Sequence, residues 1–174
     1  MTHGNPADFR TLMAGFPTGV TVVTTTGSDD LPRGMTLTSL CSVSLKPPVL
    51  LVCMRRGSPT LEAVQDVRRF AVNLLHHRAR YTAELFASGA PNRFDRVPWL
   101  ADDGAAGPHL VDAAHTIADC TVTNDQVVGD HVVIMGRVIR VTRMAEEQHP
   151  LLYGLRRFAT WPDTEDHLSY DFIS

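Results

Sequence analysis

The order of apolar and polar residues along the chain predicts strands at several places. A β-branched run from Val20 to Thr26 ends at Gly27 and two aspartates, as a strand does at a turn. The unbroken apolar run 49–54 predicts a strand that is buried on both faces. Further strands are predicted for residues 68–75, 115–128 and 129–144. The last two alternate strongly and are expected to pair as a long antiparallel hairpin around Gly129.

Apolar residues at helical spacing predict short helices between these strands. The predicted helices cover residues 6–15, 58–67 and 78–88. In the first, Phe9, Leu12 and Met13 recur as on the buried face of an amphipathic helix, so we expect them in the core. In the second, Ser58 is placed to cap the helix and Pro59 occupies its first position.

The tally is six or seven strands with two or three short helices inserted, and without the strand-helix alternation of a parallel sheet. This favours a mainly β, antiparallel barrel with peripheral helices. A chain of 174 residues suits one domain, 1–174, with its core at about 9–161. Residues 162–174 are acidic and predict a loosely docked tail. The loop at about 88–109 is long enough to predict a functional role.

Composition and charge exclude several classes of function. A net charge of −3 gives no broad positive field, which argues against nucleic-acid binding. The start of the chain lacks the pattern of a signal peptide, and the longest apolar run is far too short to span a membrane. Three cysteines without paired spacing predict no disulfide framework and no metal site. We expect a cytoplasmic protein with reduced, mostly buried thiols.

The segment 34–49, GMTLTSLCSVSLKPPV, is unusually rich in hydroxyl groups. Strand alternation puts Met35 and Leu37 on one face and Thr36 and Thr38 on the other, until the phase breaks near Ser39. After that break, Cys41, Val43 and Leu45 are expected to continue an apolar, packed face opposite Ser42 and Ser44. One interpretation is a half-exposed strand, where threonine is common. The other is a wall of a ligand site, with a bend that releases backbone N–H groups.

This segment resembles the TxSSFxSVSxxPP motif of the short-chain flavin reductases, a family of flavin-binding split barrels. Other blocks resemble the family in the same order, and together they cover most of residues 9–161: PTGVTVVTT, VLLVCMRRGSPT, RRFAVNLL, NRFDRVPW, GDHVVIMGRV and LLYGLRRFATW. The pattern of apolar and polar residues alone predicts only a small β-barrel. The resemblance implies a Greek-key split barrel that binds flavin.

The resemblance also implies which residues contact the flavin. Those expected along the isoalloxazine and ribityl chain are Thr36, Leu37, Thr38 and Ser39, with Ser42 and Val43 nearby. Those expected at the flavin phosphate, before and at a predicted helix start, are Arg55, Arg56, Gly57, Ser58 and Thr60. The family usually has Asn-Arg-Ser-Ser at this turn, so Arg55 and Gly57 depart from it, and a solvated turn is the alternative.

Three further motifs carry implied roles. Arg93 and Phe94 match the family's RF pair and are expected to close over the flavin, with simple anchoring of the loop as the alternative. His131, in the GDH motif, is expected beside the nicotinamide as the catalytic candidate, with a structural histidine as the alternative. The nicotinamide side is also expected to include Arg156, Arg157 and Phe158, the last replacing the family's Tyr.

The implied reaction is hydride transfer from NADH, or possibly NADPH, to N5 of FAD or FMN, followed by release of the reduced flavin to a separate monooxygenase. Flavin and nicotinamide supply the covalent chemistry, so the protein has to stack two rings and exclude water. The family also implies a homodimer. Two alternatives stay open: an oxidase-like enzyme with tightly bound flavin, and a non-catalytic flavin-binding barrel.

Overall fold

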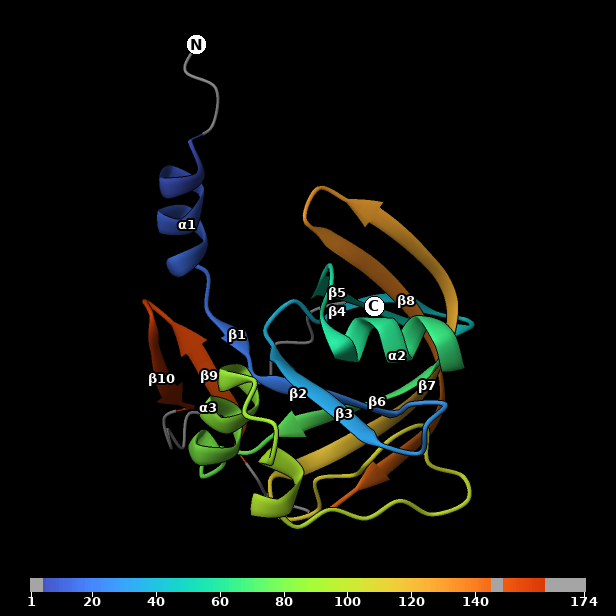
Figure 1. The fold of residues 1–174 in the computed structure, drawn as a ribbon. Coiled ribbons are helices and arrows are strands. Elements are labelled where there is room, and N and C mark those ends of the chain that lie inside the picture. The colour runs from blue at the N-terminus through green and yellow to red at the C-terminus, as the bar shows by residue number, and fades with distance from the viewer. Residues whose placement is uncertain (1–4, 145–148, 162–174) are drawn as a thin grey trace.

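The computed structural model describes residues 5–144 and 149–161 of the chain, so the predicted acidic tail lies outside the described residues. Figure 1 shows a curled sheet with helices at its periphery. The helices are α1 (Pro6–Ala14), α2 (Pro59–Val67) and α3 (Arg80–Ser88), with a 3-10 turn η1 (Arg93–Arg96). The main sheet contains β2 (Thr21–Thr26), β3 (Pro32–Leu37), β4 (Cys41–Leu45), β5 (Pro48–Arg55), β6 (Arg69–Leu75), β7 (Ala114–Val128) and β8 (His131–Arg143). A smaller sheet contains β1 (Thr18–Gly19), β9 (Leu151–Gly154) and β10 (Arg157–Thr160).

The main sheet confirms the predicted antiparallel barrel. Its seven strands lie in the order β3-β2-β6-β7-β8-β5-β4, and each neighbouring pair is antiparallel. The β7–β8 pair is the long hairpin expected from the alternation, and it turns at Gly129, whose φ of 58° is one that glycine adopts easily. The two edge strands, β3 and β4, follow each other directly in sequence. The chain therefore crosses from one edge of the sheet to the other between them.

This passage runs through Thr38, Ser39 and Leu40, which we call the crossing segment. The hydroxyl-rich stretch is therefore two strands, with the break at the predicted position. Ser39 Oγ donates to Cys53 O at 3.1 Å and accepts from Cys53 N at 2.9 Å, so one side chain takes the place of a strand partner for β5. This pairing holds the two edges of the sheet together at the crossing segment.

Consecutive residues of a strand supply two cores, because their side chains point to opposite faces of the sheet. On β2, Val23 packs inside the barrel with Phe70, Met54 and other residues, and α2 covers this cluster. Its neighbour Val22 packs on the other face with Phe86 of α3 and further residues. The burial of β5 corrects the prediction for 49–54: Val52 and Met54 are fully buried, whereas Cys53 between them and residues 49–51 before them are only half-buried.

The helix α2 begins as its sequence predicts. Ser58 is its N-cap, and the Ser58 hydroxyl accepts from the Leu61 amide at 3.2 Å. Pro59 occupies the first position of the helix, where a missing amide hydrogen costs nothing.

The prediction that α1 packs in the core is wrong. Figure 1 shows α1 standing away from the barrel, and Phe9 and Leu12 are 62% and 69% exposed. The end of the helix is held by the Leu155 amide, which donates to Ala14 O at 2.6 Å. Helical spacing showed which residues share a face of α1, but not that the barrel stands back from that face.

The smaller sheet was not predicted from the pattern, because its strands are only two to four residues long. β9 pairs with both β1 and β10. The β9–β10 turn contains Leu155 and Arg156 with φ of 50° and 60°, without the glycine that usually marks such a turn.

The three cysteines are free, but only Cys120 is buried. Burial, followed by the charge of Asp119, raises the pKa of Cys120 to about 12, which makes this thiol unreactive at neutral pH. Cys41 is exposed, so the expectation of mostly buried thiols is wrong. It lies on β4, an edge strand.

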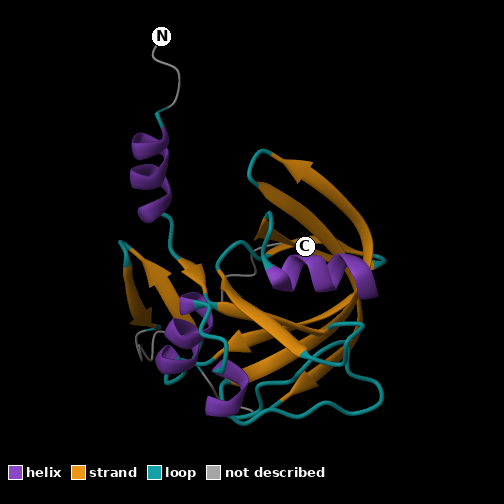
Figure 2. Cartoon of the chain, in the orientation of Figure 1, coloured by secondary structure: helices purple, strands orange, loops and turns teal. Residues whose placement is uncertain are grey.

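The long loop before β7, drawn in teal below the sheet in Figure 2, is fixed by a buried carboxylate. Asp119 on β7 is 0% exposed, and its Oδ1 accepts from the Ala106 amide at 2.7 Å and lies 2.9 Å from His109 Nε2. Its Oδ2 accepts from Arg140 Nε at 2.7 Å, and Arg140 also reaches Asp102 at 2.9 Å. Burial alone raises the pKa of a carboxyl group, but the hydrogen bonds outweigh it and hold the pKa of Asp119 below its usual range.

A second buried polar residue, Asn73 on β6, fixes the same loop from the next strand. Its Oδ1 accepts from the Leu110 amide at 2.8 Å, and its Nδ2 donates to Thr24 Oγ1 at 3.0 Å. Gly107 presses against the backbone of Thr24, where a Cβ atom would collide. The loop is therefore held in place against the sheet as an integral part of the fold.

We expect Asp119→Ala to lower the free energy of unfolding by about 3 kcal/mol, because it leaves the partly buried Arg140 guanidinium and the buried His109 imidazole without their acceptor. Asp102→Ala is the matched control, since it removes the exposed carboxylate from the same Arg140. Its expected loss is below about 1 kcal/mol. Urea denaturation measures both, and equal losses would contradict the role given to Asp119.

Candidate functional site

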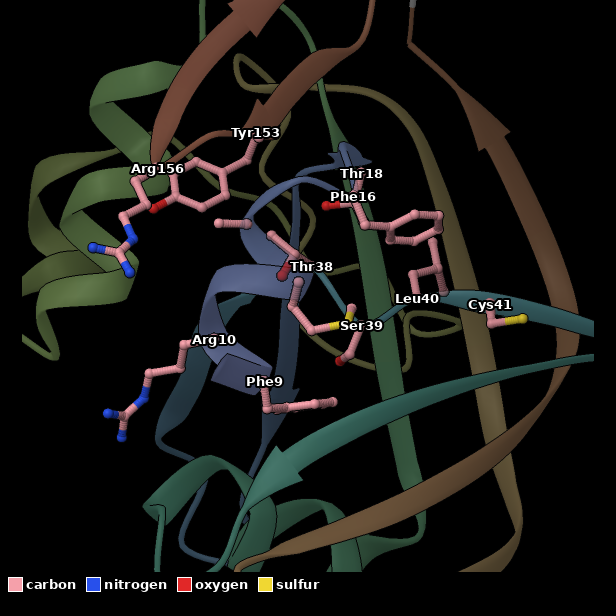
Figure 3. A pocket seen from close by; sticks show the side chains of 13 residues that line it. Phe9, Arg10, Phe16, Thr18, Thr38, Ser39, Leu40, Cys41, Tyr153 and Arg156 are labelled. Carbon is pink, nitrogen blue, oxygen red and sulfur yellow. The ribbon is translucent and has the colours of Figure 1, made fainter. Parts of the chain in front are cut away.

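A pocket of about 850 Å³ opens where the crossing segment meets α1 and the β9–β10 hairpin. Thr38, Ser39, Leu40 and Cys41 line one side of it, and α1 and the hairpin line the other. Figure 3 shows these side chains converging from parts of the chain that lie far apart in sequence. The break between β3 and β4 thus forms one wall of this large pocket.

Thr38 is the point where this pocket meets two smaller ones. A pocket of about 450 Å³ lies between Thr38 and α3 and includes Tyr153 and Phe158. Another, of about 240 Å³, lies between Thr38 and His115. Burial, followed by the charge of His76, lowers the pKa of His115, which favours its neutral form. The three hollows form a surface centred on the crossing segment.

Of the hydroxyl groups predicted to line the ligand site, some are hydrogen-bonded within the fold and one is left to meet a ligand. Thr36 Oγ1 donates to Ala83 O at 2.7 Å and ties β3 to α3, while the Ser39 hydroxyl is bonded to Cys53. Leu37 is buried in the core. Thr38 is exposed, and its hydroxyl has no hydrogen bond among the described residues. No hydrogen bond within the described chain takes up the backbone N–H of Thr38, Ser39 or Leu40 either.

The predicted apolar, packed face of β4 is wrong. Val43 is exposed, and Leu45 is 84% exposed. Ser42 is also exposed, and neither it nor Val43 lines the pocket, although Cys41 does. β4 is an edge strand with no described element over its outer face, so strand alternation could not show which face would be covered.

The turn Arg55–Ser58, which we call the basic turn, lies close to the crossing segment and to His131. Arg55 is two residues beyond Cys53 on β5, or about 7 Å along the strand from the partner of Ser39. Arg55 also pairs with His131 on β8. His131 is half-exposed, and its Nδ1 lies 2.9 Å from Asp130 Oδ1. The predicted catalytic and phosphate groups are thus neighbours.

Two backbone amides of the basic turn are used within the fold, and the space around Gly57 is open. The Arg56 and Ser58 amides donate to Asp130 O and Arg55 O at 3.0 and 3.3 Å. Gly57 has a φ of 71° and open space around the position of a Cβ atom. Thr60 is only 2% exposed, which places its side chain inside the first turn of α2.

Arg93 and Phe94 are held inside the fold. Phe94 is buried and meets Phe86 and Trp99 edge to face, with ring centroids 5.0 and 5.9 Å apart. Arg93 Nε donates to Gly34 O at 3.0 Å, and burial, followed by the charge of Arg33, lowers the pKa of Arg93. This geometry favours the alternative considered for the pair, anchoring of the loop.

The three site residues predicted on the β9–β10 hairpin lie in different surroundings. Arg156 lines the large pocket, and Phe158 lines the 450 Å³ pocket, where its ring lies 5.3 Å from that of Tyr153. Arg157 is exposed and lies in neither lining.

Several residues that line the large pocket were missed by the site prediction: Arg10, Phe16, Thr18, Leu40, Cys41 and Tyr153. A signal existed for Tyr153, which belongs to the LLYG block, and for Thr18, which pairs with it across β1 and β9.

Comparison with known proteins agrees with this geometry. The family model described as "Flavin reductase like domain" matches residues 13–162. The "Flavin reductase (NADPH)" of Lentzea aerocolonigenes is 49% identical over 159 residues, which cover 91% of this chain and 92% of that protein. The "Flavin-dependent monooxygenase, reductase subunit HsaB" of Mycobacterium tuberculosis is 32% identical over 150 residues, which cover 86% of this chain and 79% of that subunit.

Among solved structures, the NADH:FAD oxidoreductase SgcE6 of Streptomyces globisporus C-1027, in complex with NAD and FAD fragments, superposes with a TM-score of 0.86 at 31% identity. The alignment covers 95% of this chain and all 100% of that one. The fold is thus that of the flavin reductase barrels. The chain belongs to the flavin reductase family.

We expect Ser39→Ala to lower the free energy of unfolding by about 1 to 2 kcal/mol, because it leaves the N–H and C=O of Cys53 without their partner. Thr38→Ala is the adjacent control and should leave the unfolding midpoint unchanged, since its hydroxyl has no described partner. Thermal denaturation compares the two. A Thr38→Ala loss as large as that of Ser39→Ala would show that the two hydroxyls have been assigned wrongly.

Proposed function

We propose that this chain transfers a hydride from NADH or NADPH to FAD or FMN and releases the reduced flavin. The observation that carries the proposal is the crossing segment, where one hydroxyl and three backbone N–H groups that have no partner among the described residues border an open pocket. The isoalloxazine ring presents carbonyl and ring-nitrogen acceptors at one edge, which such donors suit. Family membership supports the same reaction.

The flavin and the nicotinamide carry the redox chemistry: NAD(P)H gives a hydride to the flavin and leaves as NAD(P)⁺, and the reduced flavin gains a proton from water. The contribution of the protein is positional. The crossing segment would hold the flavin ring by its polar edge, while Phe16, Leu40 and Tyr153 supply apolar surface that limits water around the stacked rings.

The flavin phosphate is assigned to the basic turn. Arg55 and Arg56 are both exposed there, and the outward-facing start of α2 adds a favourable dipole for an anion. The distance of about 7 Å along β5 from Cys53 to Arg55 allows one ligand to meet both the crossing segment and the turn.

His131 is assigned to the nicotinamide. It belongs to the strand beside Arg55, and its ring is half-exposed at the start of β8. Hydride transfer needs no acid or base. The role of His131 is therefore to position the nicotinamide or to help supply the proton taken up by reduced flavin.

We further propose a homodimer that passes reduced flavin to a separate monooxygenase in the cytoplasm. Exposed apolar residues on β4 and α1, among them Leu45 and Leu12, give the single chain a surface that a second copy would cover. The similar protein HsaB, named as the reductase subunit of a flavin-dependent monooxygenase, supports the monooxygenase partner. In the described part of the chain, no helix has the length and apolar character needed to cross a membrane. Light scattering tests the dimer, and a mass near the 19.1 kDa of one chain would contradict it.

The reaction is tested by mixing the purified chain with NADH or NADPH and added FAD or FMN in air, while following the absorbance of the reduced nicotinamide. Rapid oxidation that depends on added flavin is the expected result. Oxidation without added flavin would indicate a tightly bound flavin instead. Flavin binding with no oxidation of either nicotinamide would reject the proposed reaction.

We expect His131→Ala to raise the KM for the nicotinamide several-fold more than the KM for flavin, because its ring is assigned to the nicotinamide side. Asp130→Asn is a matched variant that keeps the histidine but weakens its 2.9 Å contact. It should have a smaller effect in the same direction. If His131→Ala changes both Michaelis constants equally, the assignment of this residue is wrong.

A further inference from the structure

Two arginines from different elements line the large pocket together. Arg10 comes from α1 and Arg156 from the β9–β10 turn. Figure 3 shows both guanidinium groups at the same side of the pocket, with Leu40 and Cys41 at the opposite side. The pocket therefore has a basic end and an end built from apolar groups and hydroxyls.

A backbone hydrogen bond joins the two elements that carry these arginines. The Leu155 amide, next to Arg156, donates to Ala14 O at 2.6 Å. Ala14 is one helical turn after Arg10, so the two residues share a face of α1, and both line the pocket. The bond thus joins the two elements close to both charges.

Neither charge has a compensating partner in the part of the chain that the structure describes. Within residues 5–144 and 149–161, neither guanidinium has an ion pair or a hydrogen bond. The 13 residues that line the pocket include no aspartate or glutamate. Two like charges facing one pocket repel each other, so this arrangement suits a bound anion that compensates both.

We propose that Arg10 and Arg156 form a clamp for the 2′-phosphate of NADPH and make this chain prefer NADPH to NADH. The inference rests on the proposed function and deepens it by naming the nicotinamide substrate. A phosphate monoester carries close to two negative charges and several acceptor oxygens, which two guanidinium groups match. With the 2′-phosphate at the basic end, the pocket extends toward Thr38, where the nicotinamide and isoalloxazine rings are assigned. This differs from the preference for NADH expected from the sequence.

The test uses the full chain with saturating FAD and compares kcat/KM for NADPH and NADH in Arg10→Ala, Arg156→Ala and the double variant. Each single variant should lower kcat/KM for NADPH about tenfold or more and change that for NADH less than about twofold, as expected for loss of a charge-assisted hydrogen bond. Arg10→Lys and Arg156→Lys should keep part of the preference. Arg143→Ala is the matched control, because Arg143 is an exposed arginine outside the pocket.

Calorimetry with NADP⁺ and NAD⁺, without flavin, gives a readout that does not need turnover. Binding of NADP⁺ should weaken in both alanine variants, while binding of NAD⁺ stays the same. Equal losses for the two dinucleotides would overturn the 2′-phosphate assignment, and so would unchanged binding of both. If the wild type oxidises neither dinucleotide, the proposed function fails, while calorimetry still decides whether the clamp exists.

Discussion

The structure depends on the pair of hydrogen bonds between the Ser39 hydroxyl and the backbone of Cys53. A seven-stranded sheet whose first and last strands are consecutive in sequence has to carry the chain from one edge to the other. Ordinary strand pairing stops at this crossing. A single hydroxyl that donates to Cys53 O and accepts from Cys53 N replaces it. The backbone N–H groups of its neighbours have no acceptor among the described residues. The same interruption that completes the barrel thus creates the polar wall of the pocket.

The remaining parts of the site are arranged around this interruption. β5 runs from the partner of Ser39 to the basic turn, and β8 places His131 beside that turn. On the other side, α1 and the β9–β10 hairpin enclose the large pocket and contribute its two arginines. The buried Asp119 and Asn73 hold the long loop against the sheet at a different place. Asp119 and Asn73 thus stabilise the fold away from the pocket, so variants of these two residues test stability separately from ligand binding.

The parts of the fold that the sequence predicts correctly are those decided by near neighbours. The cap formed by Ser58 and Pro59 involves contacts three residues apart, and the β7–β8 hairpin needs only alternation and a glycine turn. The parts that fail need distant partners. The hydroxyls of Thr36 and Thr38 look alike in sequence, and only the position of α3 makes one structural and leaves the other free. Phe9 and Leu12 have the spacing of core residues, yet nothing local to α1 shows that the barrel stands away from it. For the same reason, Arg10 could not be recognised before α1 was placed beside the hairpin.

The most direct test of this account is a crystal structure of the chain with FAD and NADP⁺. The account predicts the isoalloxazine ring against Thr38, with its polar edge bonded to the backbone N–H groups of the crossing segment, and the 2′-phosphate between Arg10 and Arg156. A flavin bound elsewhere, with Thr38 facing only water, would contradict it.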